Sequence, residues 1–314
     1  MKLGIDMGGM SIKMGLVNEE NEIIGRITIP TDLTVPYQVL VERMADAVQQ
    51  MLENAGMTLE QCEGIGIGSP GTIDAKQGVI LYSNNFGWEN VPIVEELKKH
   101  LDTRIEIAND ADVAALGEVC AGAAEGAENA VLLTLGTGVG GGVILDKKIF
   151  RGAMPGGCEL GHLSIRYDGI RCTCGRKGCL EAYASASALL RIAREKSAEH
   201  PESIMNEMCG NDLEQMNGKI PFDAAKAGDE AGMETVKEYE GYLACGIANV
   251  INTFRPEKVI LGGGVAAQRE NLTAPLKGLV KDMCFGGSHG YIADIVTSVL
   301  GNDAGIIGAA NLVV

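Results

Sequence analysis

Four potential metal ligands lie close together in the middle of this 314-residue sequence. His162 is followed, after one short loop, by Cys172, Cys174 and Cys179, and two glycines lie between the last two cysteines. Imidazole nitrogen and thiolate sulfur are the ligands that tetrahedral zinc accepts in structural sites. We therefore interpret residues 155–181 as a loop folded around one zinc ion. The alternative is a group of reduced thiols that are neighbours without binding metal.

Two carboxylates bracket these ligands. Glu159 stands three residues before the histidine, and Glu181 stands two residues after the last cysteine. A carboxylate can accept hydrogen bonds from several hydroxyl groups at once, which suits a neutral, polyhydroxylated ligand. The loop is therefore expected to contact a substrate, although both residues could instead be solvated surface charges.

Asn109 and Asp110 form a second candidate site. They follow a predicted strand at residues 104–108 and precede a predicted helix from Ala111 to about Cys120. Open α/β sheets place their sites at the carboxyl ends of strands, so the Asp110 carboxylate is well placed to act as a general base. The alternative is that Asp110 only caps the helix.

Three glycine turns each follow a predicted strand, at Gly8-Gly9, Gly136-Thr137-Gly138 and Gly262-Gly263-Gly264. Without side chains in the way, backbone N–H groups in such turns can bind phosphate. Residues 64–71 and 136–141 contain the Gly-x-Gly-x-x-Gly spacing of dinucleotide-binding sites. Neither stretch is predicted to lead into a helix, which excludes a dinucleotide-binding site of that type. The first two turns return as strands about 130 residues apart, which predicts a duplicated domain.

Composition limits the partners and the compartment. The 42 acidic and 26 basic residues give a net charge of −16, which disfavours nucleic acid and anionic lipid as partners. The N-terminus lacks the apolar core of a signal peptide, and the nine cysteines fit a reducing compartment, so a cytoplasmic protein without a membrane span is expected. An amphipathic helix is predicted over residues 36–54, and residues 196–228 are expected to form polar surface.

The sequence resembles the ROK (repressor, open reading frame, kinase) family of sugar kinases, within the superfamily of actin and hexokinase. The resemblance covers the whole chain and is carried by Glu-Leu-Gly-His at 159–162 and Cys-x-Cys-Gly-x-x-Gly-Cys-x-Glu at 172–181. It implies an α/β fold with two duplicated actin-like (ribonuclease H-like) domains around a central cleft. The small domain would span residues 1–112, with a helix at about 301–314 packing back on it, and the large domain would span 113–300 with the zinc loop.

The resemblance also implies roles for individual residues. The ATP-binding set would be Asp6, Gly8, Gly9, Ser11, Lys13, Gly136, Thr137, Gly138, Gly262, Gly263 and Gly264. The sugar-binding set would be Gly71, Asn85, Asn109, Asp110, Glu159, His162 and Glu181, with Asp110 as the catalytic base. The structural zinc ligands would be His162, Cys172, Cys174 and Cys179.

The expected function is ATP-dependent phosphorylation of the 6-hydroxyl of glucose, with Asp6 orienting the Mg²⁺ that ATP carries. Kinases of fructose, mannose, allose or an N-acetylhexosamine are the nearest alternatives, and a non-catalytic sugar sensor or repressor is another. A repressor is disfavoured by the charge and by a first strand that starts at residue 3, without room for a DNA-binding module. Met10 replaces the threonine usual in the family, which puts ATP affinity in question. A homo-oligomer, either a dimer or a tetramer, is expected.

Overall fold

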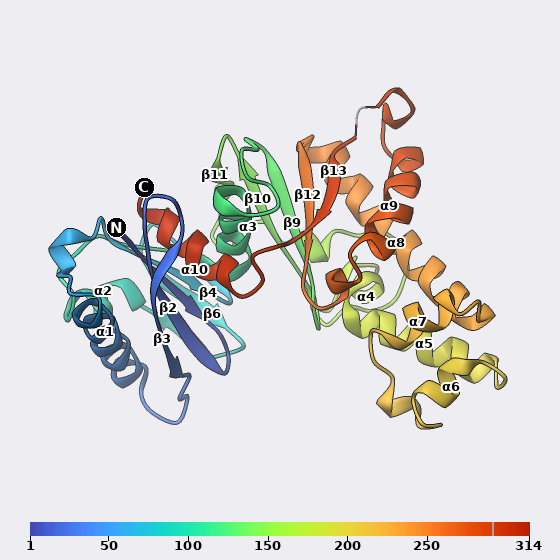
Figure 1. Ribbon diagram of the computed structural model, residues 1–314, viewed down its shortest axis with the longest axis horizontal. Helices are drawn as coiled ribbons and strands as arrows, with labels where there is room; N and C mark the ends of the chain where they lie inside the picture. Colours follow the sequence, from blue (N-terminus) through green and yellow to red (C-terminus); the bar gives the residue numbers. More distant parts are fainter. Residues whose placement is uncertain (291) are drawn as a thin grey trace. The chain divides into compact units, whose positions relative to one another are not determined.

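The computed structural model of the protein describes residues 1–290 and 292–314 (Figure 1). The chain divides into two compact units. The first comprises residues 1–132, 142–158 and 299–314, and the second comprises residues 133–141 and 159–298. The division passes through two strands, and the domain boundary expected near residue 112 stays a prediction.

The first unit is built on a five-stranded sheet with the order β3-β2-β1-β4-β8. The strands β1, β2 and β3 form the expected antiparallel meander, and β4 and β8 continue it in parallel. Their bounds are β1 Lys2–Met7, β2 Ser11–Val17, β3 Ile23–Pro30, β4 Ile65–Ser69 and β8 Ile105–Asn109.

Helices cover both faces of this sheet (Figure 1). Successive side chains of a strand point to opposite faces. On β1, Leu3 and Ile5 are fully buried in a core that includes Leu40 and Met44 of α1 (Tyr37–Asn54). Gly4, between them, lies against the backbone of α10 (Asp303–Ala310), where any side chain would collide with it. The glycine therefore permits the close approach of α10 to the sheet.

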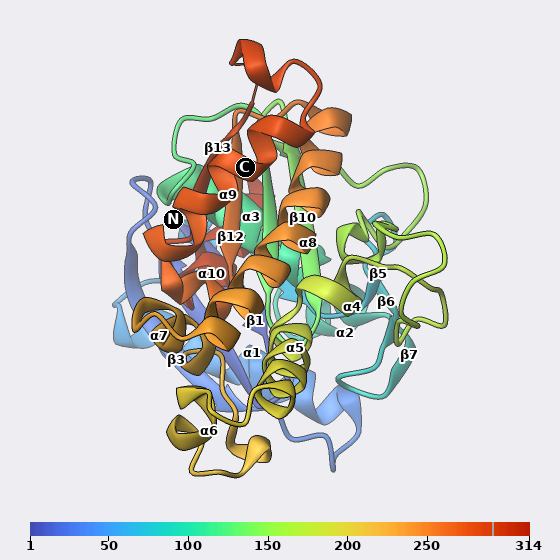
Figure 2. The same ribbon diagram turned by 90° about the vertical axis from the view of Figure 1, so that its right-hand side faces the viewer.

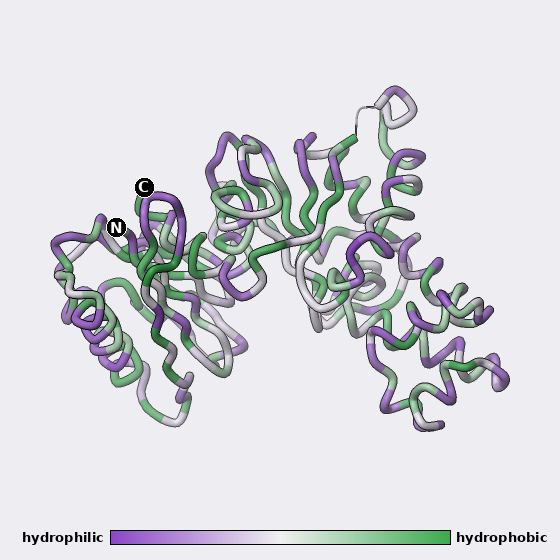
Figure 3. Tube along the Cα trace, viewed as in Figure 1, coloured by the Kyte–Doolittle hydropathy of each residue, from purple (hydrophilic) through white to green (hydrophobic). Residues whose placement is uncertain are grey.

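The remaining elements of the first unit flank this sheet. A smaller sheet has the order β5-β6-β7, with β5 Thr72–Asp74, β6 Val79–Ser83 and β7 Trp88–Val91. The helix α2 (Ile93–Lys98) follows it, and α3 (Asp110–Ala121) begins directly after β8. Hydropathy along the trace alternates on α1, where one side of the helix is polar (Figure 3).

A second five-stranded sheet has the order β11-β10-β9-β12-β13. If the strands of each sheet are numbered one to five along the chain, both sheets have the same spatial order, which is third, second, first, fourth and fifth. This repetition confirms the predicted duplication. The bounds are β9 Ala130–Leu135, β10 Val139–Leu145, β11 Lys148–Ile149, β12 Lys258–Gly262 and β13 Asp294–Thr297.

The helices of the second unit gather around α8 (Glu230–Phe254), which contacts α4, α5, α7 and α9 (Figure 2). Gly246 of α8 lies against the Leu180 side chain just before α4, with no room for a side chain of its own. The bounds of the other helices are α4 Glu181–Ala184, α5 Ala186–Glu199, α6 Ile204–Met208, α7 Ile220–Lys226 and α9 Glu270–Met283. Short 3-10 turns occupy Leu59–Gln61, Leu160–His162, Leu213–Gln215, Val265–Gln268, Gly287–His289 and Asn311–Val313.

Residues 196–228 are helical, but they are more than polar surface. This stretch folds into α6, a 3-10 turn and α7, which enclose a separate core. The buried members of that core are Ala193, Met205, Cys209, Met216, Ile220, Ala224 and Ala231. Short helices spread these apolar residues too irregularly for one periodic stripe to reveal them.

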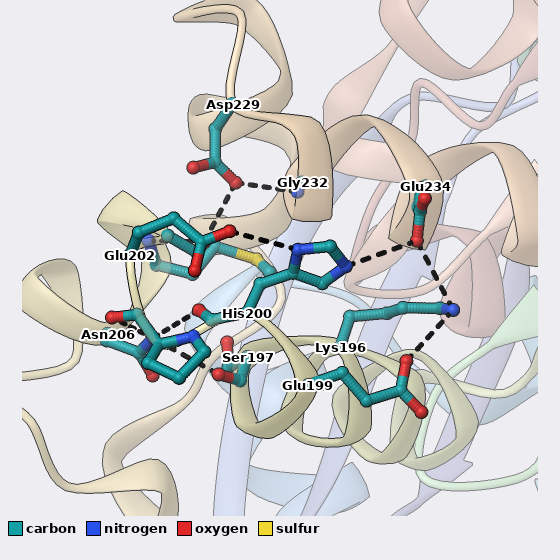
Figure 4. Close-up of polar contacts among 12 residues, drawn as sticks. Lys196, Ser197, Glu199, His200, Glu202, Asn206, Asp229, Gly232 and Glu234 are labelled. Atoms are coloured by element: carbon teal, nitrogen blue, oxygen red, sulfur yellow. Dashed lines mark hydrogen bonds and ion pairs between the residues drawn. The ribbon is translucent and has the colours of Figure 1, made fainter.

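Polar contacts join the ends of α5, α6 and α8 (Figure 4). The His200 ring lies between two carboxylates, with Nδ1 3.2 Å from Glu202 Oε1 and Nε2 3.8 Å from Glu234 Oε2. Asp229 caps α8 by accepting a hydrogen bond from Gly232 N–H at 2.8 Å. The same carboxylate accepts one from the Ser203 hydroxyl at 2.8 Å, which anchors the start of α6. These contacts hold the peripheral helices to the long central one.

None of the nine cysteines forms a disulfide within residues 1–290 and 292–314. Within residues 1–290 and 292–314, no helix combines the length and the apolar character needed to cross a membrane.

Candidate functional site

In the first unit, the turn between β1 and β2 lies beside two charged groups. Gly8 N–H donates to Ser11 O at 3.0 Å, which closes the turn. Asp6 on β1 is paired in register with Lys13 on β2. Burial raises the pKa of Asp6, the Lys13 ammonium lowers it, and the negative charge of Asp110 raises it further. The fold therefore brings Asp6, Lys13 and the predicted base into one electrostatic environment.

Asn109 ends β8 and links two strand ends. Its Oδ1 accepts from Ala111 N–H at 2.8 Å, so it caps α3. Its Nδ2 donates to Gly71 O at 3.1 Å. Gly71 has a φ of 116°, and a side chain there would collide with the backbone of Tyr82 and Ser83. Gly71 and Asn109, both predicted to bind sugar, are therefore in direct contact. The Asn109 side-chain amide can cap α3 and also contact a substrate.

Asp110 is the first residue of α3 and remains open to solvent. Desolvation by the surrounding protein raises its pKa, while Ala111 N–H, the Asp110 N–H and the Asn109 side chain lower it. A carboxylate with a raised pKa is a stronger proton acceptor than a free one. Asn109 caps α3, and Asp110 Oδ1 also accepts a hydrogen bond from Ala111 N–H, at 3.0 Å.

Met10 projects from the first turn with 90% of its side chain exposed. Its carbonyl accepts from Thr31 N–H at 3.0 Å, and the Thr31 hydroxyl donates to Gly8 O at 2.6 Å. The turn is therefore fixed by backbone bonds that do not depend on the side chain at residue 10. Asn85 follows β6 and is also exposed.

A cavity of about 220 Å³ lies within the first unit, beside Asn109. Asp74 and Lys76 from β5 and its following turn line one side, and Arg151 and Gly157 line another. Its polar lining comes from charged and amide groups that can bind hydroxyls.

In the second unit, the glycine turn between β9 and β10 is tied to the start of α5. Gly136 N–H donates to Gly138 O at 3.0 Å, Ala186 N–H donates to Gly136 O at 2.8 Å, and the Ser187 hydroxyl donates to Thr137 O at 2.9 Å. The turn after β12 packs against β9. Gly263 has a φ of 82°, and a side chain at this position would collide with the backbone of Leu135. Two predicted ATP-binding turns therefore meet within one unit.

The four predicted metal ligands converge as expected. Candidate ligand atoms of His162, Cys172, Cys174 and Cys179 all lie within 4.8 Å of one another. His162 Nδ1 is 3.7 Å from Cys172 Sγ, and Cys174 Sγ is 3.7 Å from Cys179 Sγ. These groups could hold one metal ion.

The thiols have different protonation tendencies. Burial raises the pKa of Cys172, and burial raises the pKa of Cys179 to about 12. The backbone N–H of Arg176 instead lowers the pKa of Cys174. The buried thiols stay protonated in the absence of a cation, whereas a bound metal would draw them into the thiolate form.

Glu159 and Glu181 are placed by this loop. Glu159 is exposed at the start of a 3-10 turn, where its carbonyl accepts from His162 N–H at 3.0 Å. Glu181 Oε2 accepts from Val139 N–H at 3.0 Å, and Glu181 Oε1 accepts from the Thr173 hydroxyl at 3.0 Å. Sequence reasoning did not identify Thr173, although a hydroxyl between two predicted ligands was a signal that could have been used.

The predicted residues thus form two groups, one in each unit. Those of the first unit are Asp6, Gly8, Gly9, Ser11, Lys13, Gly71, Asn85, Asn109 and Asp110. Those of the second unit are Gly136, Thr137, Gly138, Glu159, His162, Cys172, Cys174, Cys179, Glu181, Gly262, Gly263 and Gly264.

Comparison with known proteins extends over the whole chain. Glucokinase of Thermotoga maritima is 36% identical over 99% of this chain and 96% of its own length. The structure of a ROK family glucokinase from Streptomyces griseus, in complex with glucose and AMPPNP, matches with a TM-score of 0.78 and 32% identity over 99% of this chain and 98% of that one. ROK hexokinase from Thermus thermophilus matches with a TM-score of 0.80 and 32% identity over 99% and 97% of the two chains. The ROK family model matches residues 2–314, so the chain belongs to the ROK family.

Proposed function

We propose that this protein is an ATP-dependent hexose kinase that phosphorylates the 6-hydroxyl of glucose. The observation that carries the proposal is Asp110, a carboxylate with a raised pKa at a strand end beside Asp6 and a glycine turn. This arrangement occurs in a chain that is similar to glucokinases along its entire length.

The reaction needs an aligned nucleophile and compensation of negative charge, with little covalent work from the protein. The Asp110 carboxylate accepts the proton of the sugar hydroxyl while that oxygen forms a bond to the γ-phosphorus. The bond between the γ-phosphorus and the bridging oxygen breaks, and ADP leaves. Proton removal by a positioned base contributes about 10² to 10⁴ in rate.

Binding of the two substrates is assigned to the remaining predicted residues. The glycine turns at 8–9, 136–138 and 262–264 offer backbone N–H groups to the phosphates and adenosine of ATP. Mg²⁺, when bound with ATP, neutralises phosphate charge. Asp6 would orient that ion, and Asn109, Glu159 and Glu181 would bind sugar hydroxyls.

Zinc fits the four-ligand cluster. Two thiolates on one tetrahedral zinc, each about 2.3 Å from the metal, lie about 3.7 to 3.8 Å apart. The Cys174 and Cys179 sulfurs are 3.7 Å apart, so the pair is already spaced for the ion. His162, Cys172, Cys174 and Cys179 would hold it, and a bound zinc would stabilise the loop that carries Glu159 and Glu181.

Other proposals follow from the family and the composition. Fructose, mannose, allose and an N-acetylhexosamine are the alternative substrates. Mannose and allose differ from glucose in the orientation of one hydroxyl, fructose in the position of its carbonyl group, and an N-acetylhexosamine in an acetamido group. A homo-oligomer and a cytoplasmic location stay predictions.

A coupled assay of ADP release over a panel of hexoses tests the function. We expect the highest kcat/KM with glucose and no sugar-dependent ADP release without ATP. Preference for another hexose would reassign the substrate, and ADP release that no hexose stimulates would overturn the kinase proposal.

A further inference from the structure

The Glu181 carboxylate connects two regions of the second unit that the proposed function assigns to different substrates. Its Oε2 accepts a hydrogen bond from Val139 N–H, the first residue after the glycine turn, at 3.0 Å. Its Oε1 accepts one from the Thr173 hydroxyl, in the cysteine loop, at 3.0 Å. Each oxygen of the carboxylate is therefore fixed by a different segment, and the plane of the group is set by both.

The glycine turn and Glu181 are also linked through the helices α4 and α5. Glu181 is the first residue of α4, and α5 starts two residues after α4 ends. The start of α5 holds the turn through Ala186 N–H to Gly136 O and the Ser187 hydroxyl to Thr137 O. A side chain at Gly138 would collide with the Glu181 carboxylate. Movement of the turn must therefore displace Glu181 or break its hydrogen bond.

Two side chains of the cysteine loop contact Glu181 Oε1. Cys172 Sγ lies 3.4 Å from Glu181 Oε1 and can donate only as a thiol. The Thr173 hydroxyl donates to the same oxygen at 3.0 Å and is the shorter of the two contacts.

We propose that Thr173 is a positioning residue for Glu181, and that the Thr173–Glu181–Val139 chain of hydrogen bonds couples occupancy of the glycine turn to sugar affinity. This inference rests on the proposed function, in which the turn binds nucleotide and Glu181 binds a sugar hydroxyl. Phosphate contacts that fix the turn also fix Val139 N–H and, through it, the carboxylate. By linkage, the sugar must raise nucleotide affinity by the same factor as the nucleotide raises sugar affinity.

The test compares Thr173→Val, which keeps the shape and removes the hydroxyl, with Thr173→Ser, which keeps the donor. Glucose binding is measured by calorimetry with and without a non-hydrolysable ATP analogue. We expect Thr173→Val to weaken glucose binding about three- to tenfold, the range that the loss of one ordinary intramolecular hydrogen bond implies. The analogue should strengthen glucose binding to wild type but have little effect on the valine variant.

Two controls separate positioning from damage to the loop. Zinc content and affinity for the analogue alone should match wild type in all variants, and Thr173→Ser should restore glucose affinity and coupling. Ser164→Ala removes an exposed hydroxyl from the same loop, where it contacts Arg166 O at 3.5 Å, and should change neither quantity. Unchanged glucose affinity and coupling in Thr173→Val would overturn the proposal.

A second measurement tests the coupling independently of which sugar the protein binds. The Val139 amide resonance reports its hydrogen bond to Glu181, and it should shift in Thr173→Val and on addition of the analogue to wild type. If wild type binds no glucose while this resonance responds as expected, the substrate assignment is wrong and the coupling stands. If the resonance is indifferent to both changes, the coupling is wrong.

Discussion

Glu240 on α8 is a buried carboxylate whose replacement should stabilise the protein. Its side chain is 6% exposed, and its Oε1 accepts no hydrogen bond from residues 1–290 or 292–314. Burial disfavours the charged form and raises the pKa of Glu240 to about 7, against about 4.3 for a free glutamate. Each pKa unit corresponds to about 1.4 kcal/mol, so ionisation lowers the free energy of unfolding by at most about 3.8 kcal/mol. Because proteins relax and admit water around buried charges, we expect about 2 kcal/mol.

The direction of the pH dependence follows from the raised pKa. A folded state that holds its proton more tightly than the unfolded chain is stabilised below the unfolded pKa. That contribution is lost as the pH rises from about 4.3 through about 7. Glu240→Gln removes the charge at every pH, so its advantage over wild type should be small near pH 4 and reach about 2 kcal/mol near pH 8.

Differential scanning calorimetry at these two pH values measures the effect. For a unit of this size, about 2 kcal/mol corresponds to a rise in Tm of about 4 to 8 °C at the higher pH. Glu230→Gln, at the exposed start of the same helix, is the matched control and should change the free energy of unfolding by no more than about 0.5 kcal/mol. A Glu240→Gln variant that is no more stable than wild type at the higher pH, or equally stabilised at both, would refute the reasoning.

Three further predictions concern other parts of the chain. Cys174→Ser should reduce zinc from about one ion per chain by elemental analysis and raise the KM for glucose strongly, with ATP binding largely kept; zinc-free wild-type protein with unchanged sugar affinity would contradict this. Met10→Thr should lower the KM for ATP and leave the KM for glucose nearly unchanged, since a hydroxyl replaces an exposed thioether at the turn; an unaltered ATP KM would show that backbone donors and Ser11 suffice. Hydrogen bonds from Gly232 N–H and Ser203 outweigh burial and hold the pKa of Asp229 below its usual value, so Asp229→Ala should cost about 1 kcal/mol near neutral pH by chemical denaturation. Because this stabilisation is present above the unfolded pKa and is lost as the pH falls through the lower folded one, the difference from wild type should shrink below about pH 4; a constant difference would contradict the assignment.

Features that depend on local sequence order were predictable. A strand followed by glycines and a return strand specifies a meander, so both repeats could be recognised before the sheets were seen. The spacing of Cys172, Cys174 and Cys179 confines their sulfurs to one turn of chain, and the four ligands lie together as expected. Asn109 and Asp110 likewise follow from the end of β8.

Features that depend on contacts between distant segments were not predictable. The hydrogen bond from Val139 N–H to Glu181 joins residues 42 positions apart, and periodicity carries no information about it. Glu240 is a buried carboxylate beside Tyr239 on α8, and hydropathy does not predict the burial of a charged residue. The cause is that α8 contacts α4, α5, α7 and α9, so more than one of its faces is covered. The core around Met205 was missed because its members are spread over several short helices.

The central claim is that this chain transfers the γ-phosphoryl group of ATP to glucose with Asp110 as the base. The most direct test is phosphorus and carbon NMR of the products from wild type and Asp110→Asn, with glucose binding measured on both by calorimetry. The account predicts glucose 6-phosphate and ADP in equal amounts from wild type. It predicts a fall in kcat of at least about 10² for the variant, with modest change in glucose affinity. Near-normal turnover in Asp110→Asn, or phosphate at another hydroxyl, would contradict it.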